Sequence, residues 1–145
     1  MKYELVQSSK KDVNKIKEYN KKTIYQYAND LSEEEINEIN DYVNKTIPIE
    51  LANYQNIIID DKMIGCLLVT NYEDGKEIAE LYLEEEYRSK GIVTKIINNI
   101  IKENNILYLW VYKKNKKAIS LYKRLGFIII DETTSRYHMK YNDNN

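Results

Sequence analysis

Cysteine and histidine each occur once in the 145 residues, as Cys66 and His138. One cysteine cannot form an internal disulfide, and one residue of each type is too few for a structural zinc site built on these ligands. Proline also occurs once and glycine four times, so no segment has the composition of a linker between domains. We therefore expect a single domain over residues 1–145, without a metal, and with residues 142–145 as a frayed polar tail.

Neither sign of charge dominates, because the sequence has 22 Lys and Arg residues and 23 Asp and Glu residues. A nucleic-acid-binding protein usually has a basic excess, so we expect no nucleic acid as a partner. Apolar runs such as Met63–Val69 are far shorter than the roughly 20 residues that span a bilayer. Lys2 and Glu4 lie where a signal peptide would be apolar. We expect a cytoplasmic, soluble protein with no membrane partner.

The first half of the chain has the patterns of one strand, two helices and three further strands. Short alternation predicts a strand near residues 2–6, and helical spacing predicts a helix from about residue 10 into the twenties. Ser32 and Glu35 form a capping box that begins a second helix, with Pro48 beyond its end. The runs 55–59 and 63–72, joined by a polar turn at 60–62, predict a hairpin. Asp74-Gly75 then leads into a strand over 76–83.

In the second half, isoleucines at i, i+4 spacing predict a buried helix over about 90–104, followed by a strand over 106–112. Asn115 caps a further helix that Gly126 ends, and two strands follow at 127–130 and 136–141. The inner face of that last helix is expected at Ala118, Leu121, Tyr122 and Leu125. The order β-α-α-β-β-β-α-β-α-β-β predicts an α/β (α+β) domain around one mixed sheet.

The junction before the isoleucine-rich helix has the features of an anion site. A helix begins there, and its first N–H groups and dipole favour negative charge. Gly91 has no Cβ to block a ligand, and Arg88 and Lys90 add positive charge. These features fit a phosphate or pyrophosphate site. The local pattern also fits a plain strand–helix connection with solvated charges.

The surrounding sequence resembles the GCN5-related N-acetyltransferase (GNAT) family. The family's pyrophosphate loop reads Gln/Arg-x-x-Gly-x-Gly/Ala after a strand. This chain reads Leu81-Tyr82-Leu83-Glu84-Glu85-Glu86-Tyr87-Arg88-Ser89-Lys90-Gly91-Ile92-Val93, which keeps all but the last Gly/Ala of the loop. The second signature, Asn-x-x-Ala-x-x-Leu-Tyr-x-x-x-Gly-Phe, is complete as Asn115, Ala118, Leu121, Tyr122, Gly126 and Phe127. A helix and a strand separate the two motifs, as in the family.

The resemblance implies a fold and a coenzyme site. The sheet would have six to seven strands flanked by about four helices and would splay between the fourth and fifth strands. Acetyl-CoA would be the cosubstrate, with its pantetheine arm in that opening. The positions implied to bind it are Leu81, Tyr82, Leu83, Arg88, Ser89, Lys90, Gly91, Ile92, Val93, Thr94, Asn115 and Tyr122. Val93 replaces the family's second Gly/Ala, so we expect weakened or shifted binding there.

The resemblance also implies catalytic roles. A backbone N–H near Leu83 would polarise the thioester carbonyl, and Tyr122 would protonate the departing thiolate. Glu77 and Glu80 are the candidates for the general base, although both could be exposed strand residues. Trp110 occupies a place where other members carry a glutamate.

Other side chains with reactive or charged groups are expected to be structural. We expect His138 to be a strand residue and Cys66 to be packed in the core. The run Glu84-Glu85-Glu86 is expected to be a solvated face.

The sequence therefore predicts an enzyme that moves an acetyl group from acetyl-CoA to a primary amine by direct transfer in a ternary complex. The acceptor, a small molecule or a protein amino group, would enter beside residues 22–32 and 131–136. These segments carry Tyr25, Tyr27, Asp30, Asp131, Glu132 and Arg136. The alternative is a non-catalytic acyl-CoA-binding or interaction module, which Val93 and the lack of an obvious base favour. The oligomeric state is open, a homodimer included.

Overall fold

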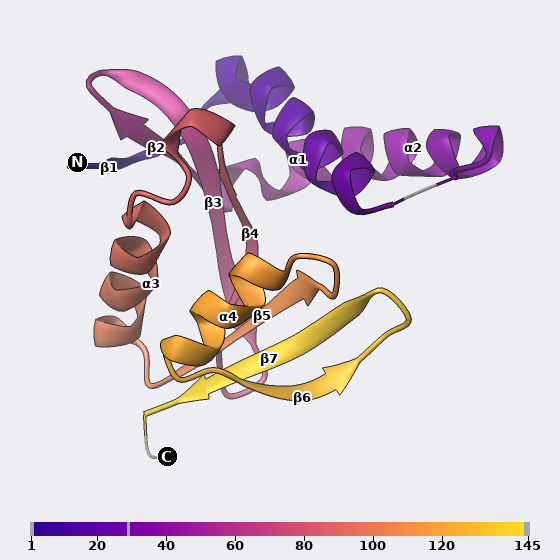
Figure 1. The fold of residues 1–145 in the computed structure, drawn as a ribbon. Coiled ribbons are helices and arrows are strands. Elements are labelled where there is room, and N and C mark those ends of the chain that lie inside the picture. Colours follow the sequence, from indigo (N-terminus) through magenta and orange to yellow (C-terminus); the bar gives the residue numbers. More distant parts are fainter. Residues whose placement is uncertain (1, 29, 144–145) are drawn as a thin grey trace. The chain divides into compact units, whose positions relative to one another are not determined.

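The computed structural model describes residues 2–28 and 30–143, which contain seven strands and four α-helices in the predicted order (Figure 1). The elements are β1 Glu4–Gln7, α1 Val13–Tyr27, α2 Glu33–Glu50, β2 Tyr54–Ile59, β3 Lys62–Tyr72, β4 Gly75–Leu83, α3 Ile92–Glu103, β5 Ile106–Tyr112, α4 Lys116–Arg124, β6 Ile128–Glu132 and β7 Arg136–Asn142. Short 3₁₀ segments lie at Lys10–Asp12, Leu51–Asn53 and Glu85–Tyr87. No helix in this part of the chain is long and apolar enough to cross a bilayer.

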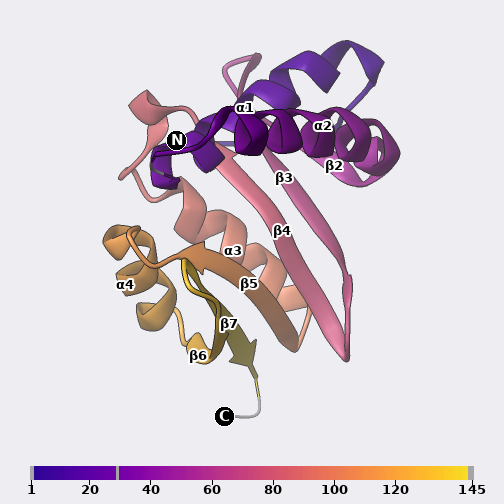
Figure 2. The same ribbon diagram turned by 90° about the vertical axis from the view of Figure 1, so that its right-hand side faces the viewer.

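The strands form a mixed sheet in the order β1-β2-β3-β4-β5-β7-β6 (Figure 2). β4 and β5 are parallel, as a strand–helix–strand crossover through α3 requires. Their pairing joins Lys76–Ile78 to Leu107–Leu109, whereas β4 itself continues to Leu83. The predicted mixed sheet, with a splay between its fourth and fifth strands, is confirmed.

The chain groups into two compact units by its internal contacts. Unit 1 comprises the chain up to Leu68 together with Glu80–Glu84, and unit 2 comprises Val69–Ala79 together with the chain from Glu85 onward. β3 and β4 each contribute residues to both units.

Unit 1 has its core beneath α1 and α2. This core consists of Ile16, Tyr19, Val43, Ile47, Tyr54, Cys66, Leu68 and Tyr82. Cys66 is fully buried, which confirms the packed position expected for it. At the start of α2, the Ser32 hydroxyl accepts the Glu35 N–H and the Glu35 carboxylate accepts the Ser32 N–H, both at 3.1 Å. This is the predicted capping box.

The end predicted for α2 was wrong, because the helix includes Pro48 and continues to Glu50. Proline lacks the N–H that would bond the carbonyl of Asn44, and it normally ends or kinks a helix. Here the last turns are held by tertiary packing, since Val43 and Ile47 are buried in the unit 1 core and Leu51 packs against it. Burial of these side chains outweighs the local preference of one residue.

Gly65 in β3 permits a close backbone contact with β4. A Cβ at this position would overlap the Tyr82 carbonyl oxygen and lie 3.2 Å from the Cα of Leu83. The β2–β3 register also shifts here, since Ile57 pairs with Gly65 and Ile58 with Met63. Ile64 is therefore the extra residue of a bulge, and its carbonyl accepts the Glu84 N–H at 2.8 Å.

Gly65→Ala is expected to destabilise the fold by about 3 kcal/mol, because both atoms in the clash belong to backbone that cannot rotate away. The matched control is Gly91→Ala, where an added Cβ meets nothing within 4 Å and only the left-handed backbone is strained. Urea unfolding of the two variants measures the difference. A loss for Gly65→Ala no larger than that for Gly91→Ala would contradict the close contact.

Unit 2 buries the isoleucine face of α3 and the alternating apolar residues of its strands. The fully or nearly fully buried side chains are Ile92, Ile96, Ile97, Leu107, Leu109, Val111, Phe127 and Met139. The residues predicted for the inner face of α4 are only half-buried. The buried residue of this helix is Ile119, which was not among them. At the C-terminus, Asn142 ends β7 and the Asp143 N–H bonds the Asn105 carbonyl at 2.9 Å. The rest of the predicted frayed tail, residues 144–145, lies outside the described residues.

Candidate active site

The start of α3 differs from the starts of α2 and α4, because no side chain caps it. Its N-cap is Gly91 with φ +82°, and Ser89 is also left-handed at φ +61°. The first helical hydrogen bond runs from the Lys95 N–H to the Gly91 carbonyl at 3.1 Å. The N–H groups of residues 92–94 precede that bond and have no carbonyl within the helix to pair with. A Cβ added at Gly91 would meet nothing within 4 Å, so a ligand could approach the backbone from that side, and this end of α3 has the geometry of an anion site.

The charges beside this turn are mixed. Arg88 is half-buried and Lys90 exposed, while Glu85 and Glu86 are exposed in the preceding 3₁₀ segment. Val93, in the first turn of α3, is half-buried. Arg88 and Lys90 thus precede the first turn of α3 in the chain, and cations near a helix N-terminus add to its positive dipole end.

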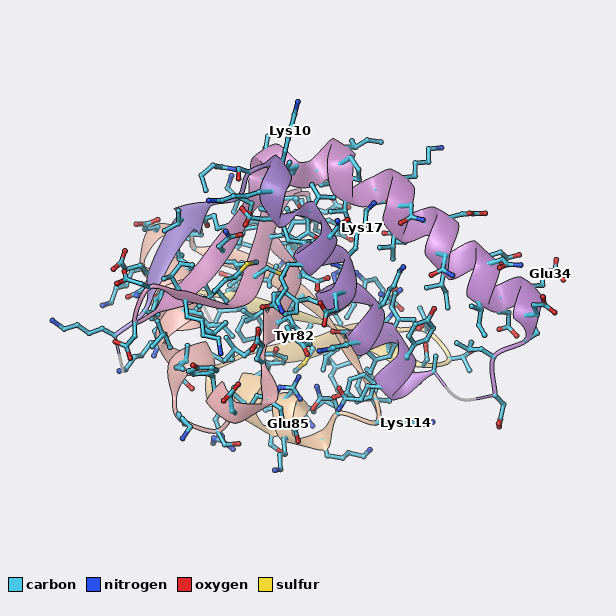
Figure 3. The ribbon with its side chains drawn as sticks, turned by 90° about the horizontal axis from the view of Figure 1, so that it is seen from above. Lys10, Lys17, Glu34, Tyr82, Glu85 and Lys114 are labelled. Atoms are coloured by element: carbon cyan, nitrogen blue, oxygen red, sulfur yellow. The ribbon has the colours of Figure 1, made fainter. Side chains whose placement is uncertain are left out.

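Glu84 is not part of a solvated face, so the expectation for the acidic run was wrong at this residue. Its carboxylate accepts the Tyr19 hydroxyl at 2.6 Å and lies 3.8 Å from the Lys15 ammonium, with 19% of the side chain exposed. Tyr82, labelled in Figure 3, stacks on Tyr19 with ring centroids 4.6 Å apart. Burial, together with the bond to Glu84, raises the pKa of Tyr19. The first acid of the run is thus held within unit 1.

The Asn115 motif has a structural explanation at most of its positions. The Asn115 side-chain oxygen accepts the Ala118 N–H at 3.2 Å and caps α4. Gly126 is left-handed at φ +103°, and Phe127 is buried. The Tyr122 ring lies 5.9 Å from the Phe127 ring, centroid to centroid. Packing against Phe127 accounts for the ring of Tyr122.

Glu80 is largely buried in unit 1, so it is not the exposed strand residue that the sequence left open. Its Oε1 atom is buried without a hydrogen-bond partner. Burial raises the pKa values of Tyr54 and Cys66, and the nearby charge of Glu80 raises them further. Burial raises the pKa of Glu80 itself to about 8. At neutral pH the group therefore holds a proton most of the time.

Glu80→Gln is expected to stabilise the protein at alkaline pH. Because the pKa of Glu80 is higher in the folded state (about 8) than its ordinary value of 4.5, folding binds a proton between these values and stability falls as pH rises through them. Glutamine has no charge to bury, so the variant should gain about 2 to 4 kcal/mol at pH 8.5 and almost nothing near pH 4. Urea unfolding at the two pH values measures the gain. Glu38→Gln, which removes an exposed carboxylate, is the control, and an equal gain in both variants would contradict the burial of Glu80.

Glu77 is also withdrawn from solvent, in unit 2, beside His138. Its Oε2 lies 3.4 Å from His138 Nε2, and the side chains are 14% and 5% exposed. The contact is not a hydrogen bond, and both atoms are buried without a hydrogen-bond partner. The His138 ring stacks on Trp110 at 4.2 Å and 6°. His138 is a buried strand residue, as expected, but its contact with Glu77 was not foreseen.

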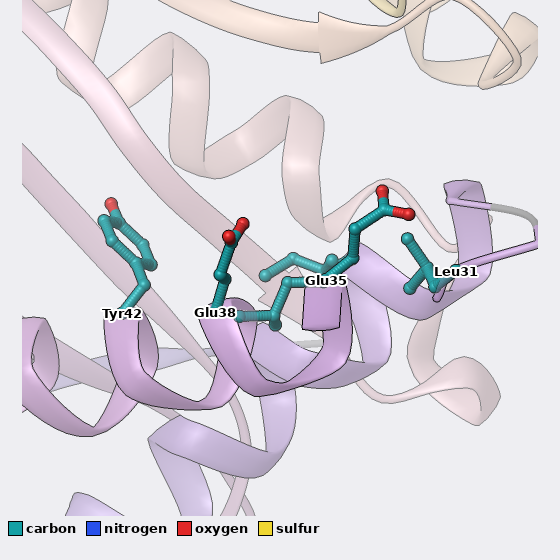
Figure 4. Close-up of a pocket in the computed structure, with 6 residues that line it drawn as sticks. Leu31, Glu35, Glu38 and Tyr42 are labelled. Carbon is teal, nitrogen blue, oxygen red and sulfur yellow. The ribbon is translucent and has the colours of Figure 1, made fainter. Parts of the chain in front are cut away.

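A shallow groove of about 250 Å³ lies elsewhere, in unit 1. It is lined by Ile24, Leu31, Glu35, Glu38, Ile39 and Tyr42. Figure 4 shows Glu35, Glu38 and Tyr42 projecting from α2 toward the same side. Two lining residues, Ile24 and Leu31, fall within the predicted acceptor segment 22–32. None of the predicted catalytic or coenzyme-binding residues lines this groove.

The strand order and the parallel β4–β5 pair define an N-acetyltransferase fold. The fold superposes with a TM-score of 0.76 on a PaiA N-acetyltransferase of Thermoplasma acidophilum, solved in complex with coenzyme A, at 22% identity over 98% of this chain and 99% of that one. The sequence model of the acetyltransferase (GNAT) family matches residues 16–127. The chain belongs to the GNAT family.

Two curated relatives match part of the chain. An uncharacterized N-acetyltransferase of Methanocaldococcus jannaschii is 39% identical over 69 residues, which cover 43% of this chain and 30% of the relative. The acetyltransferase PseH of Campylobacter jejuni is 33% identical over 92 residues, which cover 59% of this chain and 57% of the relative. The chain thus spans 30% of the length of the first relative and 57% of the length of the second.

Proposed function

We propose that the chain, as one N-acetyltransferase domain over residues 1–145, transfers an acetyl group from acetyl-CoA to a primary amine by direct attack in a ternary complex. The observation that carries the proposal is the uncapped N-terminus of α3 at Gly91, which lies where the family motif has its pyrophosphate loop. Membership of the GNAT family and the likeness to a coenzyme A complex support the same donor.

Coenzyme binding would use the backbone more than side chains. The pyrophosphate would accept hydrogen bonds from the N–H groups at the start of α3, with Arg88 and Lys90 balancing its charge. The pantetheine arm would run along the strand Leu81–Leu83, whose N–H groups include the donor for the thioester oxygen. Because the side-chain oxygen of Asn115 caps α4, the amide nitrogen of that side chain is the group that would contact the pantetheine arm. The binding positions are those of the family motifs: Leu81, Tyr82, Leu83, Arg88, Ser89, Lys90, Gly91, Ile92, Val93, Thr94, Asn115 and Tyr122.

The acceptor nitrogen must lose two protons. An ammonium cannot attack the thioester, so a base takes the first proton before attack and later releases it to solvent. The Tyr122 hydroxyl would protonate the leaving thiolate, and the second proton from the nitrogen would then restore that hydroxyl. We assign the base to Glu77, since Glu80, with its pKa raised to about 8 by burial, is mostly protonated at neutral pH. Glu80 stays the second candidate for the base. Comparing the acetyl-transfer rates of Glu77→Gln and Glu80→Gln tests which of the two residues is the base.

The test is thiol release from acetyl-CoA with a panel of amines that includes polyamines, amino sugars and peptide amino groups. The proposal predicts amine-dependent release and an acetylated product by mass. Coenzyme A binding is measured separately by its effect on the melting temperature. Binding without release for every amine would favour the non-catalytic acyl-CoA-binding module, and absence of binding would contradict both functions.

A further inference from the structure

The groove of unit 1 combines apolar side chains with carboxylates. Ile24 of α1 and Ile39 of α2 are part of its apolar lining, and both pack against the buried core of the unit, which holds them in place. Glu35, Glu38 and Tyr42 line it from α2, where spacings of three and four residues put them on one stripe of the helix (Figure 4). The volume of about 250 Å³ is below the roughly 300–1,000 Å³ of pockets for drug-sized ligands, so the groove suits a small or thin molecule.

The charge of the segment that forms this groove is negative and is not balanced by nearby cations. Residues 23–44 contain no Lys or Arg, and their acids are Asp30, Glu33, Glu34, Glu35, Glu38 and Asp41. The whole chain has a formal net charge of only -1, so these acids are a local excess. In the part of the chain that the structure describes, neither Glu35 nor Glu38 forms an ion pair. The capping bond from the Ser32 N–H occupies one oxygen of Glu35 and adds no countercharge.

The position of Glu38 is unfavourable for α2 itself. Glu35 is in the first turn, where a negative charge interacts favourably with the helix dipole, but Glu38 lies beyond that turn. It is four residues from Glu34 and three from Glu35 and Asp41, and like charges at these spacings destabilise a helix. Tyr42, of which 62% is exposed, adds an aromatic ring to the same lining. A bound cation would relieve the repulsion between the carboxylates and could contact the face of this ring.

We propose that this groove binds the aliphatic chain and the second ammonium of a diamine or polyamine acceptor, an inference that rests on the proposed acetyl transfer. Methylene groups would cover the apolar lining, and the ammonium would lie near the carboxylates of Glu35 and Glu38. The same carboxylates would repel a phosphorylated or acidic acceptor. The other nitrogen of the acceptor takes the acetyl group: its C–N bond forms as the thioester C–S bond breaks, and coenzyme A leaves as the thiol. The ammonium in the groove keeps its proton and its charge.

Binding to the groove is tested without catalysis, by NMR titration of the isotope-labelled protein with diaminobutane and with butylamine, which has the same chain and one amine. Diaminobutane should shift the amide signals of the lining residues, with a dissociation constant at least about five-fold lower than that of butylamine. The double variant Glu35→Gln/Glu38→Gln should lose most of these shifts. Glutamine at position 35 can still accept the Ser32 N–H, so α2 stays capped. The matched control is Glu33→Gln/Glu34→Gln, which removes two exposed carboxylates of α2 from outside the lining and should change the affinity less than about two-fold.

The second arm measures KM and kcat for acetyl transfer to the same two amines. Loss of both groove carboxylates should raise KM for diaminobutane about 10-fold, whereas KM for butylamine, which has no second ammonium, should change less than about two-fold. The value of kcat should stay nearly the same for both amines, because the groove binds the part of the acceptor that does not react. Added salt should raise KM for diaminobutane in the unsubstituted protein and much less in the Glu35→Gln/Glu38→Gln variant, since it screens charges that are exposed.

The two arms separate the failure of the groove from that of the function. Acetylation of diaminobutane with the same KM in both double variants would overturn the groove and leave the proposed function intact. Transfer to amino sugars or peptide amino groups, with diaminobutane and longer polyamines refused, would overturn the substrate class. Binding of diaminobutane at the groove without transfer to any amine would overturn the proposed function and, with it, the role of the groove as an acceptor site.

Discussion

Tyr122→Phe is expected to lower kcat for acetyl transfer by a factor of about 10² to 10⁴, the usual range for losing a general acid. The change removes only the hydroxyl, while the ring that packs 5.9 Å from Phe127 stays in place. Stability and coenzyme A affinity should therefore change little. The measurement is kcat with acetyl-CoA and an accepted amine, below and above pH 8, in single turnovers so that chemistry is observed directly.

Tyr141→Phe is the matched control for this prediction. The Tyr141 ring lies 5.7 Å from the same Phe127, and its substitution also removes one hydroxyl from that cluster. It should keep nearly full activity, since Tyr141 is outside the motif that carries Tyr122. If Tyr122→Phe keeps more than about half of kcat, the hydroxyl has no catalytic part and the residue is there for packing.

Gly91→Glu is expected to abolish the rise in melting temperature that coenzyme A gives to the unsubstituted protein. At 100 times the dissociation constant, a ligand that binds only the folded state stabilises it by about 2.7 kcal/mol. A glutamate at the N-cap of α3 would place bulk and negative charge where the pyrophosphate is proposed to bind. Dephospho-coenzyme A should keep most of the stabilising effect, and free pantetheine should give little.

Gly91→Asn separates this effect from backbone strain. Gly91 has φ +82°, and asparagine adopts such a conformation more readily than other residues with a side chain. Both variants change the same backbone position, but asparagine adds no charge. We expect it to keep a measurable shift with coenzyme A. An undiminished shift in Gly91→Glu would show that the coenzyme binds elsewhere.

The features of the fold that the sequence predicted well depend on local contacts. The Ser32–Glu35 capping box and the Asn115 cap are set by residues three positions apart. The hairpin turn at Asp60 and Asp61 is local in the same way, with both residues left-handed at φ +50° and +63°. Patterns of this kind are readable because the partners are always near each other.

The features that could not be predicted from the sequence depend on contacts between distant segments. The sequence could not show that the end of α2 packs well enough to include Pro48, or that Glu84 turns toward Tyr19. The burial of Glu80 depends in the same way on residues from other elements of unit 1. The approach of Glu77 to His138 follows from the β4–β5–β7 order and the side-chain alternation, which become usable only when the strand order is known.

The claim on which the account most depends is that this chain binds acetyl-CoA, and a calorimetric titration of the purified protein with acetyl-CoA tests it most directly. We expect one site per chain with a dissociation constant between about 1 μM and 1 mM, the range in which enzymes usually hold their substrates. The Gly91→Glu variant should give no binding heat under the same conditions. No heat and no thermal stabilisation of the unsubstituted protein at millimolar acetyl-CoA would contradict the account.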